Sequence, residues 1–162
     1  GHWKNADNLI AETDSAGNKH VRFTPTPAFE TPDAVRSLCD AYNQAVAQEV
    51  CDPLMLLILF VFDFLCIHPF NDGNGRISRI MMNAELVHAD QSKIIIPTVF
   101  RDDYLNALRR LTRKGDPSVI IRAISRVREF SAKIVGEDFN ATRDYLEKCN
   151  AFKESEGYIL RF

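Results

Sequence analysis

Apolar residues recur every three or four positions over most of the chain, which is the spacing of an α-helix with one buried face. This spacing predicts helices that start at Thr31 and at Asp52-Pro53, and further helices over about 76–89, 101–114, 117–135 and 141–153. The segment 54–67 is apolar nearly all round, so we expect it to lie in the centre of the fold. It has 14 residues and contains Asp63, and it is therefore too short and too polar to span a bilayer.

Local signals predict where these helices end and which faces they bury. In Thr31-Pro32 and Asp52-Pro53 a capping side chain precedes a proline in the first turn. Gly115 is expected to end the helix over 101–114. The inward face of the helix over 76–89 is expected to consist of Ile77, Ile80, Met81, Ala84 and His88. In the helix over 117–135 we expect Ile120, Ala123, Ile124, Val127, Phe130 and Ile134 inside, and Arg122, Arg126, Glu129 and Lys133 outside.

One part of the chain has a convincing β pattern. Segments 8–11 and 20–23 flank the turn-forming cluster 14–18 and predict a hairpin within about 6–24. The prolines that follow it exclude a helix and an inner strand at that point. The expected fold is mainly α: a single domain over 1–162, with a compact helical bundle over about 31–153 around a central helix-loop-helix, and one β-hairpin near its start.

Composition narrows the class of protein. The chain has 162 residues, the length of one domain, and its 46% hydrophobic and 26% charged residues are typical of a globular protein. A formal net charge of −2 argues against a domain built only to hold nucleic acid or an anionic membrane. The first residue is Gly1 and no leader pattern follows, so we expect a fragment of a longer protein or a tag remnant. The cysteines form no C-x-x-C pair and are expected to be reduced core thiols of a cytoplasmic protein: Cys39, Cys51, Cys66 and Cys149.

Candidate chemistry is concentrated in residues 68–79, which read His-Pro-Phe-Asn-Asp-Gly-Asn-Gly-Arg-Ile-Ser-Arg. Gly73 and Gly75 can adopt positive φ and leave backbone N–H groups uncovered. A loop expected over 68–75 leads into a helix N-terminus, which favours phosphate. Arg76 and Arg79 lie about 60° apart on that helix, so both guanidinium groups can reach one polyphosphate.

Two further side chains complete this set. Asp72 offers a carboxylate beside the phosphate site, as proteins use to hold Mg²⁺. His68 ends an apolar helix, and an imidazole with an unperturbed pKa of about 6.5 suits a general base that takes a proton from a hydroxyl nucleophile. Each feature alone is common in loops and on solvated helix faces. Their occurrence together within 12 residues predicts a nucleotidyl or phosphoryl transferase.

The same segment resembles the signature of the Fic family, H-P-F-x-[D/E]-G-N-G-R-x-x-R, at every specified position from His68 to Arg79. Residues 63–67 before it and the upstream hairpin also resemble that family, and the resemblance extends over about residues 1–150. It implies the Fic fold and protein adenylylation, in which AMP moves from ATP to a Ser, Thr or Tyr hydroxyl of a target protein and pyrophosphate is released. Relatives with Lys in place of Gly75 are kinases, so Gly75 favours adenylyl over phosphoryl transfer.

By position, the resemblance implies a role for each residue of the motif. His68 would take the proton from the target hydroxyl, Asp72 would hold Mg²⁺, and Phe70 would anchor the loop in the core. Gly73-Asn74-Gly75 would form the anion loop, and Arg79 would hold the γ-phosphate. The nucleotide-binding residues would be Asn71, Gly73, Asn74, Gly75, Arg76 and Arg79.

The resemblance also implies partners. The hairpin, called the flap in this family, would align a target protein by adding a strand to an exposed edge, 8–11 or 21–23; a hairpin that only caps the core is the alternative. Many relatives carry an inhibitory helix with [S/T]-x-x-x-E-[G/N]. Here Glu156-Gly157 fits the end of that pattern, but Phe152 stands where a hydroxyl residue is expected, so we interpret Glu156 as a solvated tail residue. An inhibitory helix would then precede Gly1 or come from an antitoxin-like partner.

Three other interpretations stay open. The same scaffold could transfer UMP, phosphate or phosphocholine, because the residues that select the nucleotide base lie outside the motif. A non-enzymatic module could bind protein or nucleic acid through a basic cluster that is equally well explained by a helix C-terminus, although we expect no nucleic acid or membrane partner. That cluster is Arg109, Arg110, Arg113 and Lys114. A zinc hydrolase that uses His68 and His88 lacks any usual ligand spacing, and we expect His88 on the core face of its helix.

Overall fold

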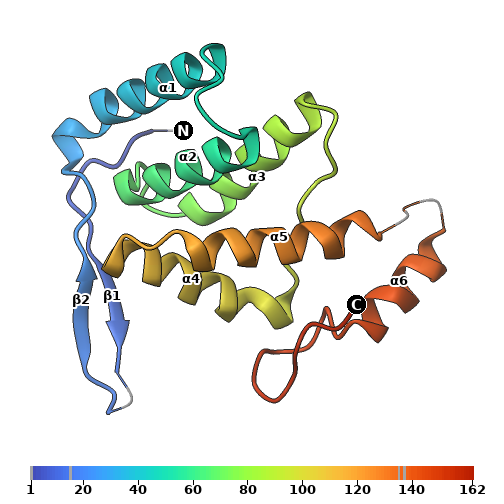
Figure 1. Cartoon of the computed structure of the whole chain (residues 1–162). Coiled ribbons are helices and arrows are strands. Elements are labelled where there is room, and N and C mark those ends of the chain that lie inside the picture. Colours follow the sequence, from blue (N-terminus) through green and yellow to red (C-terminus); the bar gives the residue numbers. More distant parts are fainter. Residues whose placement is uncertain (1, 15, 135, 137) are drawn as a thin grey trace. The chain divides into compact units, whose positions relative to one another are not determined.

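The structure is a computed structural model that describes residues 2–14, 16–134, 136 and 138–162. This part of the chain forms six α-helices, two short 3₁₀ helices and one two-stranded antiparallel sheet (Figure 1). The predicted mainly α fold with one hairpin is therefore confirmed. The chain divides into two compact units, Gly1–Ala84 and Glu85–Phe162. Among the described residues we find no helical segment with the length and hydropathy of a membrane span.

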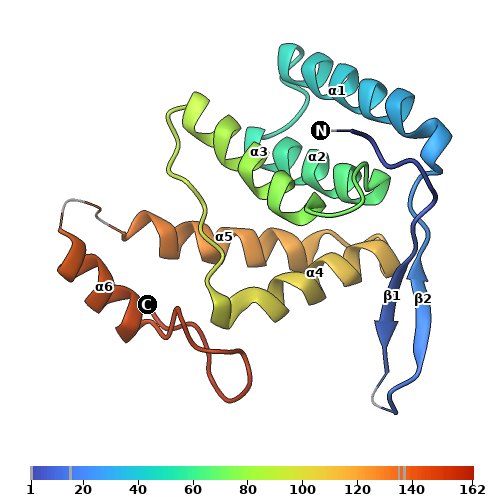
Figure 2. The ribbon, with the colours of Figure 1, turned by 180° about the vertical axis from the view of Figure 1, so that it is seen from behind.

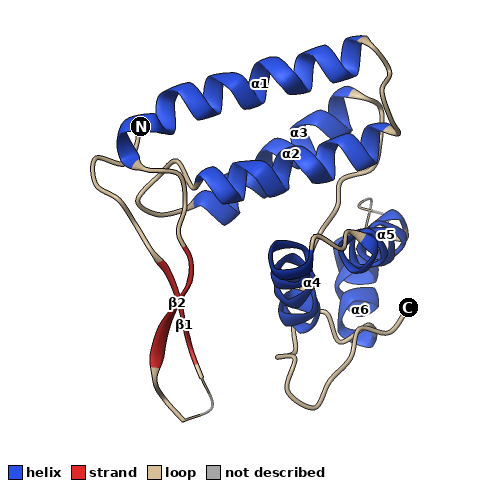
Figure 3. Cartoon of the chain, turned by 60° about the vertical axis from the view of Figure 1, so that its left-hand side comes forward, coloured by secondary structure: helices blue, strands red, loops and turns tan. Residues whose placement is uncertain are grey.

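The first unit begins with the predicted hairpin, which consists of β1 (Ile10–Thr13) and β2 (Lys19–Phe23). Figure 3 shows these two strands as the sheet of the described chain. The first strand starts later than the predicted segment 8–11, whereas the second includes the whole of 20–23. In a sheet of two strands each strand pairs along one edge, so each has a second edge that takes no part in this pairing.

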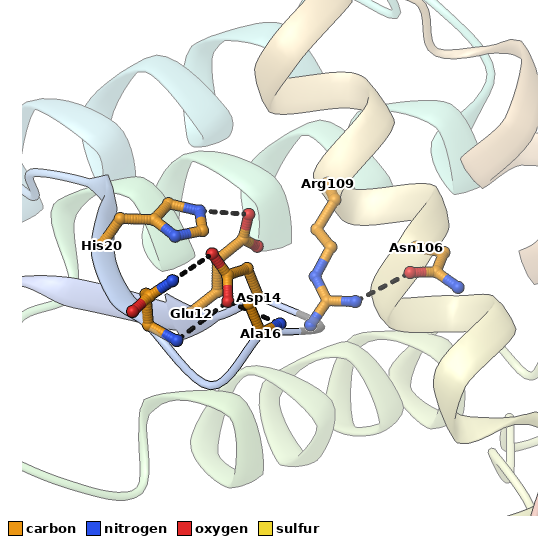
Figure 4. A network of polar contacts seen from close by, with 7 residues as sticks. Glu12, Asp14, Ala16, His20, Asn106 and Arg109 are labelled. Carbon is orange, nitrogen blue, oxygen red and sulfur yellow. Dashed lines mark hydrogen bonds and ion pairs between the residues drawn. The ribbon is translucent and has the colours of Figure 1, made fainter.

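Side chains fix the turn and the register of this hairpin (Figure 4). The carboxylate of Asp14 accepts hydrogen bonds from the backbone N–H groups of Ala16 and Asn18 at 2.9 and 2.8 Å. Glu12 and His20 lie directly opposite each other, and the Glu12 Oε1 and His20 Nε2 atoms are 3.0 Å apart. The turn is an Asx-type turn of the kind that a cluster of turn formers predicts.

Helix α1 (Thr31–Ala47) packs along α2 (Pro53–Ile67), as Figures 1 and 2 show. Asp52 caps α2 as predicted, because its Oδ1 accepts hydrogen bonds from the N–H groups of Leu54 and Met55 at 2.9 and 3.2 Å. The expected burial of α2 is also confirmed. Its buried residues are Leu57, Ile58, Phe60, Val61, Phe64 and Ile67.

The predicted cap of α1 is wrong. A short 3₁₀ helix (Ala28–Glu30) precedes α1, and Thr31 is already its first helical residue. The Thr31 side chain is fully buried, and its hydroxyl donates to the carbonyl of Pro27 at 2.9 Å instead of accepting from an N–H group. The Thr31 side chain therefore holds the segment that leads from Pro27 into α1. Pro32 occupies the first turn of α1 as expected.

Helix α3 (Asn74–His88) begins two residues before its predicted start at Arg76, and its buried face differs from the predicted one. The buried positions recur every four residues: Asn74, Ser78, Met82 and Leu86. Ile80, which we expected inside, is 68% exposed, and Ala84 and His88 are exposed as well. The reason is that Asn74 bonds the carbonyl of Phe70 in the preceding loop and Ser78 bonds the carbonyl of Gly75, so polar side chains occupy the inner face.

The second unit is helical. Helix α4 (Arg101–Lys114) has the predicted bounds and ends at Gly115, whose φ of 62° is the left-handed value that favours glycine. It packs against α5 (Ser118–Ala132), and Figure 3 shows the two helices nearly end-on. The predicted faces of α5 are confirmed except that Ile134 is half-buried and Ser131 is buried. Val135, the predicted end of this helix, lies outside the described residues.

The last helix is shorter than predicted at its C-terminal end. Helix α6 (Phe139–Lys148) starts after Asp138, whose carboxylate accepts hydrogen bonds from the N–H groups of Asn140 and Ala141 at 2.8 and 3.1 Å. Asn150 then takes a positive φ of 61°, which ends the helical path before the predicted end at Lys153.

All four cysteines are free thiols. Cys149 is buried and Cys39 and Cys66 are half-buried, but Cys51 is exposed at the start of the turn before α2, so the prediction that it belongs to the core is wrong. Burial raises the pKa of Cys66 to about 11, with a further contribution from the charge of Asp63. This thiol is therefore protonated at neutral pH and unreactive.

Candidate functional site

His68 is held at the C-terminal end of α2. Its backbone has φ 52° and ψ 60°, a left-handed conformation, and its N–H donates to the carbonyl of Phe64 at 2.9 Å. A residue other than glycine adopts this conformation only where its surroundings hold it, at a cost of about 1–3 kcal/mol. The imidazole Nδ1 lies 3.3 Å from the carbonyl oxygen of Leu65, which orients the ring.

The contact with Leu65 also sets the tautomer of the ring. A carbonyl oxygen can only accept, so Nδ1 carries the proton and Nε2 keeps its lone pair in the neutral imidazole. Burial lowers the pKa of His68 from its ordinary value of 6.5, and the charge of Lys4 lowers it further, while the bond to Leu65 acts in the opposite direction. His68 is therefore neutral at pH 7, and Nε2 can accept a proton, as a general base requires.

Asn74 closes the loop that follows His68. Its Nδ2 donates to the carbonyl of Phe70 at 2.7 Å, and its Oδ1 accepts from the N–H of Phe70 at 2.9 Å. The residue is 2% exposed, so both ends of the amide are used inside the protein. The side chain of Asn74 is thus engaged with Phe70, and the nucleotide contact expected for Asn74 could come only from its backbone N–H.

Phe70 is fixed by its ring as well as by its backbone. The ring stacks on Trp3 with centroids 5.4 Å apart, and it meets Phe64 at 6.3 Å in a tilted arrangement. Pro69 beside it is fully buried. These contacts pack the start of the loop against Trp3 and Phe64, in agreement with the anchoring role expected for Phe70.

Asp72, Gly73 and Arg76 form a cluster at the entrance of α3. Gly73 has a φ of 83°, and a Cβ at this position would lie 3.6 Å from Nη2 of Arg76, so the guanidinium lies close over the glycine. The carboxylate of Asp72 accepts hydrogen bonds from the N–H of Gly73 and, at 3.0 Å, from Nη2 of Arg76. The Asp72 carboxylate thus occupies two donors, the Gly73 N–H and the Arg76 guanidinium, that a bound anion could use.

The N-terminal end of α3 carries the second guanidinium. Gly75 lies in the first turn of the helix rather than in the loop, and only Gly73 of the two glycines has the expected positive φ. A Cβ at Gly75 would lie 3.5 Å from Nη1 of Arg79, so this guanidinium covers Gly75. The helix begins with the N–H groups of Arg76 and Ile77, which both donate to the Gly73 carbonyl at 2.9 Å. A helix N-terminus next to two guanidinium groups is an electrostatic environment that favours phosphate groups.

The donors for a metal ion are few. Among the described residues no three His, Cys, Asp or Glu side chains gather into a metal site. Asp72 is a single carboxylate whose side chain is 90% exposed. Mg²⁺ often binds through one or two carboxylates together with substrate phosphates, and Asp72 fits that mode of binding but not a site made by the protein alone.

Sequence reasoning missed two residues of this site, Trp3 and Lys4. Lys4 is 3% exposed, and its Nζ donates to the carbonyl of Ile67 at 2.9 Å. Neither residue belongs to a periodic pattern or to a motif that we recognised, so the sequence carried no signal for them.

The residues of the other interpretations make local contacts or lie at the surface. On α4, Arg109 donates to Asn106 at 2.8 Å (Figure 4), and Arg110 donates to Asp116 at 3.1 Å just beyond the helix end. Such bonds are typical of a helix surface and its C-terminus. His88 is exposed at the end of α3, so the expectation that it faces the core is wrong.

Curated relatives match much of this chain. It is 30% identical over 134 residues to a protein of Aquifex aeolicus named a probable protein adenylyltransferase, and it is 33% identical over 101 residues to the protein adenylyltransferase Fic of Nematostella vectensis. A protein of Ostreid herpesvirus 1 named ribonucleoside-diphosphate reductase small chain is 34% identical over 106 residues. These matches cover 83%, 60% and 59% of this chain, respectively. The chain spans 38%, 23% and 17% of the lengths of these relatives.

A solved structure and a family model agree on the family. A Fic domain-containing signalling protein of Bacteroides thetaiotaomicron superposes with a TM-score of 0.65 at 27% identity, over 79% of this chain and 50% of that one. The family model described as Fic/DOC matches residues 1–86, which is more than half of the chain and includes the whole motif from His68 to Arg79. The chain belongs to the Fic/DOC family.

Proposed function

We propose that this chain transfers AMP from ATP to a Ser, Thr or Tyr hydroxyl of a target protein and releases pyrophosphate. The observation that carries the proposal is an oriented imidazole, His68, with a lowered pKa, at the start of a loop that leads to a helix N-terminus covered by the guanidinium groups of Arg76 and Arg79. The name of the Aquifex aeolicus relative agrees with this activity.

His68 would act as the general base. Its Nε2 takes the proton of the target hydroxyl while the hydroxyl oxygen forms a bond to the α-phosphorus of ATP. The bond from that phosphorus to the oxygen that bridges to the β-phosphate breaks, and pyrophosphate leaves with the electron pair. A positioned base contributes about 10² to 10⁴ in rate, so phosphate binding and orientation must supply most of the remainder.

The phosphates of ATP would lie at the entrance of α3. The α- and β-phosphates would accept hydrogen bonds from the N–H groups of residues 73–75, Arg76 would contact phosphate oxygens, and Arg79 would hold the γ-phosphate. Asn71, which is exposed on the loop, would line the rim of this site. Both Arg76 and the N–H of Gly73 have to leave the Asp72 carboxylate to take this part. Exposed ion pairs such as Asp72–Arg76 contribute only about 0–1 kcal/mol.

Asp72 would hold Mg²⁺ together with phosphate oxygens. Once Arg76 turns to the nucleotide, the carboxylate of Asp72 is available as an oxygen ligand for a hard cation. The ion, when bound, would offset the negative charge that develops on the leaving pyrophosphate.

A target protein would dock along the hairpin as an added strand. β1 and β2 each have a strand edge that takes no part in their own pairing, and an extended segment added there gains main-chain hydrogen bonds. Such docking would align a hydroxyl-bearing residue of the target with His68.

Inhibition would come from a segment or partner outside residues 1–162. Glu156 is exposed and lies beyond the end of α6 in a stretch without helix, so it does not form the inhibitory helix of the family pattern. An inhibitory helix or an antitoxin-like partner would therefore be supplied from elsewhere. We place the reaction in the cytoplasm, where free thiols such as Cys51 stay reduced.

The proposal is tested with ATP labelled on the α-phosphate or on the γ-phosphate. The chain is incubated with Mg²⁺ and a cell lysate, and labelled proteins are then identified by mass spectrometry. We expect label from the α position and a mass increase of one AMP on a hydroxyl residue. His68→Ala should lose this label, whereas His88→Ala, which changes an exposed histidine outside the site, should keep it. Label from the γ position alone would indicate phosphate transfer and would overturn the proposal.

A further inference from the structure

Lys4 contacts the residues on both sides of His68. Its Nζ donates to the carbonyl oxygen of Ile67 at 2.9 Å, and its backbone N–H donates to the carbonyl oxygen of Pro69, also at 2.9 Å. A third bond, from Nζ to Oδ1 of Asn8 at 3.2 Å, holds the ammonium from the other side. One residue therefore fixes the carbonyl before and the carbonyl after the imidazole-bearing residue.

The backbone at His68 needs such support. The carbonyl of Ile67 is among the last carbonyls of α2, which have no partner within the helix, and a cation at a helix C-terminus is favourable there. His68 itself is in the left-handed conformation, which persists only where neighbouring contacts hold it. Lys4 is 3% exposed, and a lysine is almost never buried to this extent without partners.

We infer that Lys4 is a positioning residue of the transfer reaction: the hydrogen bond from its Nζ to the carbonyl of Ile67 supports the backbone turn that aims the His68 imidazole, next to a backbone bond to Pro69 that anchors residue 4 there. The inference rests on the proposed function, because it gives Lys4 a part in orienting the base of that reaction. The backbone bond to Pro69 does not depend on the side chain, so the part that belongs to the lysine itself is the bond from Nζ to the carbonyl of Ile67.

The charge of Lys4 adds a second effect on the same ring. The positive charge disfavours protonation of His68, so the pKa of His68 is lowered by burial first and by Lys4 in addition. The pKa of Lys4 is lowered by burial, and Asp7 is the carboxylate whose charge acts against that change. Lys4 thus holds the imidazole in place and favours its neutral form.

The test compares Lys4→Met and Lys4→Arg with wild type, and Lys93→Met serves as the control because Lys93 is an exposed lysine outside the site. The pKa of His68 is measured by NMR titration of its ring protons in the protein without nucleotide. The value of kcat for AMP transfer and the Kd for ATP are measured alongside. If Lys4 served only the fold, its substitution would change the free energy of unfolding but neither the pKa of His68 nor the kcat of the folded protein.

We expect Lys4→Met to raise the pKa of His68 and to lower kcat about tenfold or more, since small misplacement of a reacting group has effects of this size. The Kd for ATP should change less than kcat, because Lys4 does not touch the phosphate site. Lys4→Arg keeps a charge and should return the pKa of His68 toward the wild-type value. A folded Lys4→Met protein with wild-type pKa and kcat would overturn the inference.

The outcomes remain decisive if a variant fails to fold or if the reaction is a different one. If Lys4→Met does not fold, Lys4→Gln is measured in the same way, because glutamine keeps a hydrogen-bond donor but no charge. Failure of both variants to fold overturns the inference, since the residue then serves the fold alone. A raised pKa of His68 in a protein that transfers no AMP would refute the proposed function while the coupling of Lys4 to His68 stands.

Discussion

Asn74→Ala should lower the stability of the protein more than any exposed substitution in the same loop. The amide of Asn74 makes two hydrogen bonds to the backbone of Phe70, at 2.7 and 2.9 Å, and is 2% exposed. Removing it leaves a carbonyl and an N–H without these partners in a protected site. A hydrogen bond contributes about 0.5–1.5 kcal/mol, and a buried group left unpaired costs about 1–3 kcal/mol, so we expect a loss of about 2–4 kcal/mol.

Unfolding in guanidinium chloride, followed by circular dichroism, measures this loss. For a chain of this size each kcal/mol corresponds to about 2–4 °C in Tm, so calorimetry should show a decrease of about 5–15 °C. Asn71→Ala is the matched control, because Asn71 is an exposed residue of the same loop and its replacement should change stability by no more than about 0.5 kcal/mol. An Asn74→Ala protein within about 1 kcal/mol of wild type would refute the role assigned to this side chain.

Four further predictions concern the same segment. The lowered pKa of His68 predicts that kcat/KM falls as the pH drops, with an apparent pKa below 6.5, because the protonated ring cannot accept a proton; a pH profile with an apparent pKa above 6.5 would contradict this. The same shift predicts that stability decreases as the pH falls below 6.5, which denaturation at several pH values checks. Gly73→Ala should cost about 1–2 kcal/mol, because its φ of 83° strains any other residue, and calorimetry of ATP binding should show weaker affinity. Gly17→Ala, at φ 86° in the hairpin, should cost a similar amount of stability and leave ATP affinity unchanged; equal loss of affinity in both variants would refute the role of Gly73. Asp72→Asn releases Arg76, so ATP should bind without Mg²⁺ at least as tightly as to wild type, and the gain that Mg²⁺ gives to wild type should disappear in titration calorimetry.

Features that depend on neighbouring residues could be predicted from the sequence. The cap at Asp52, the stop at Gly115 and both ends of α4 agree with prediction, because caps and stops act within one helical turn. The candidate site could be recognised for the same reason, since its predicted residues lie in one continuous stretch from His68 to Arg79.

Features that depend on distant packing could not be predicted in this way. Counting apolar residues placed Ile80 inside α3, but it is 68% exposed, because Asn74 and Ser78 turn inward to bond backbone groups. Lys4 could not be predicted as part of the site, since its partner Ile67 lies 63 residues away along the chain and lysines are usually solvated.

A crystal structure with a non-hydrolysable ATP analogue and Mg²⁺ tests most directly whether the motif brings a base and a triphosphate together. We expect the phosphates at residues 73–79, with room for one hydroxyl oxygen between Nε2 of His68 and the α-phosphorus. A hydrogen bond of about 3 Å and a near-attack distance of about 3–3.5 Å keep those two atoms within about 6.5 Å of each other. A triphosphate bound away from the N-terminus of α3, or an α-phosphorus that no hydroxyl beside His68 can reach, would contradict the account.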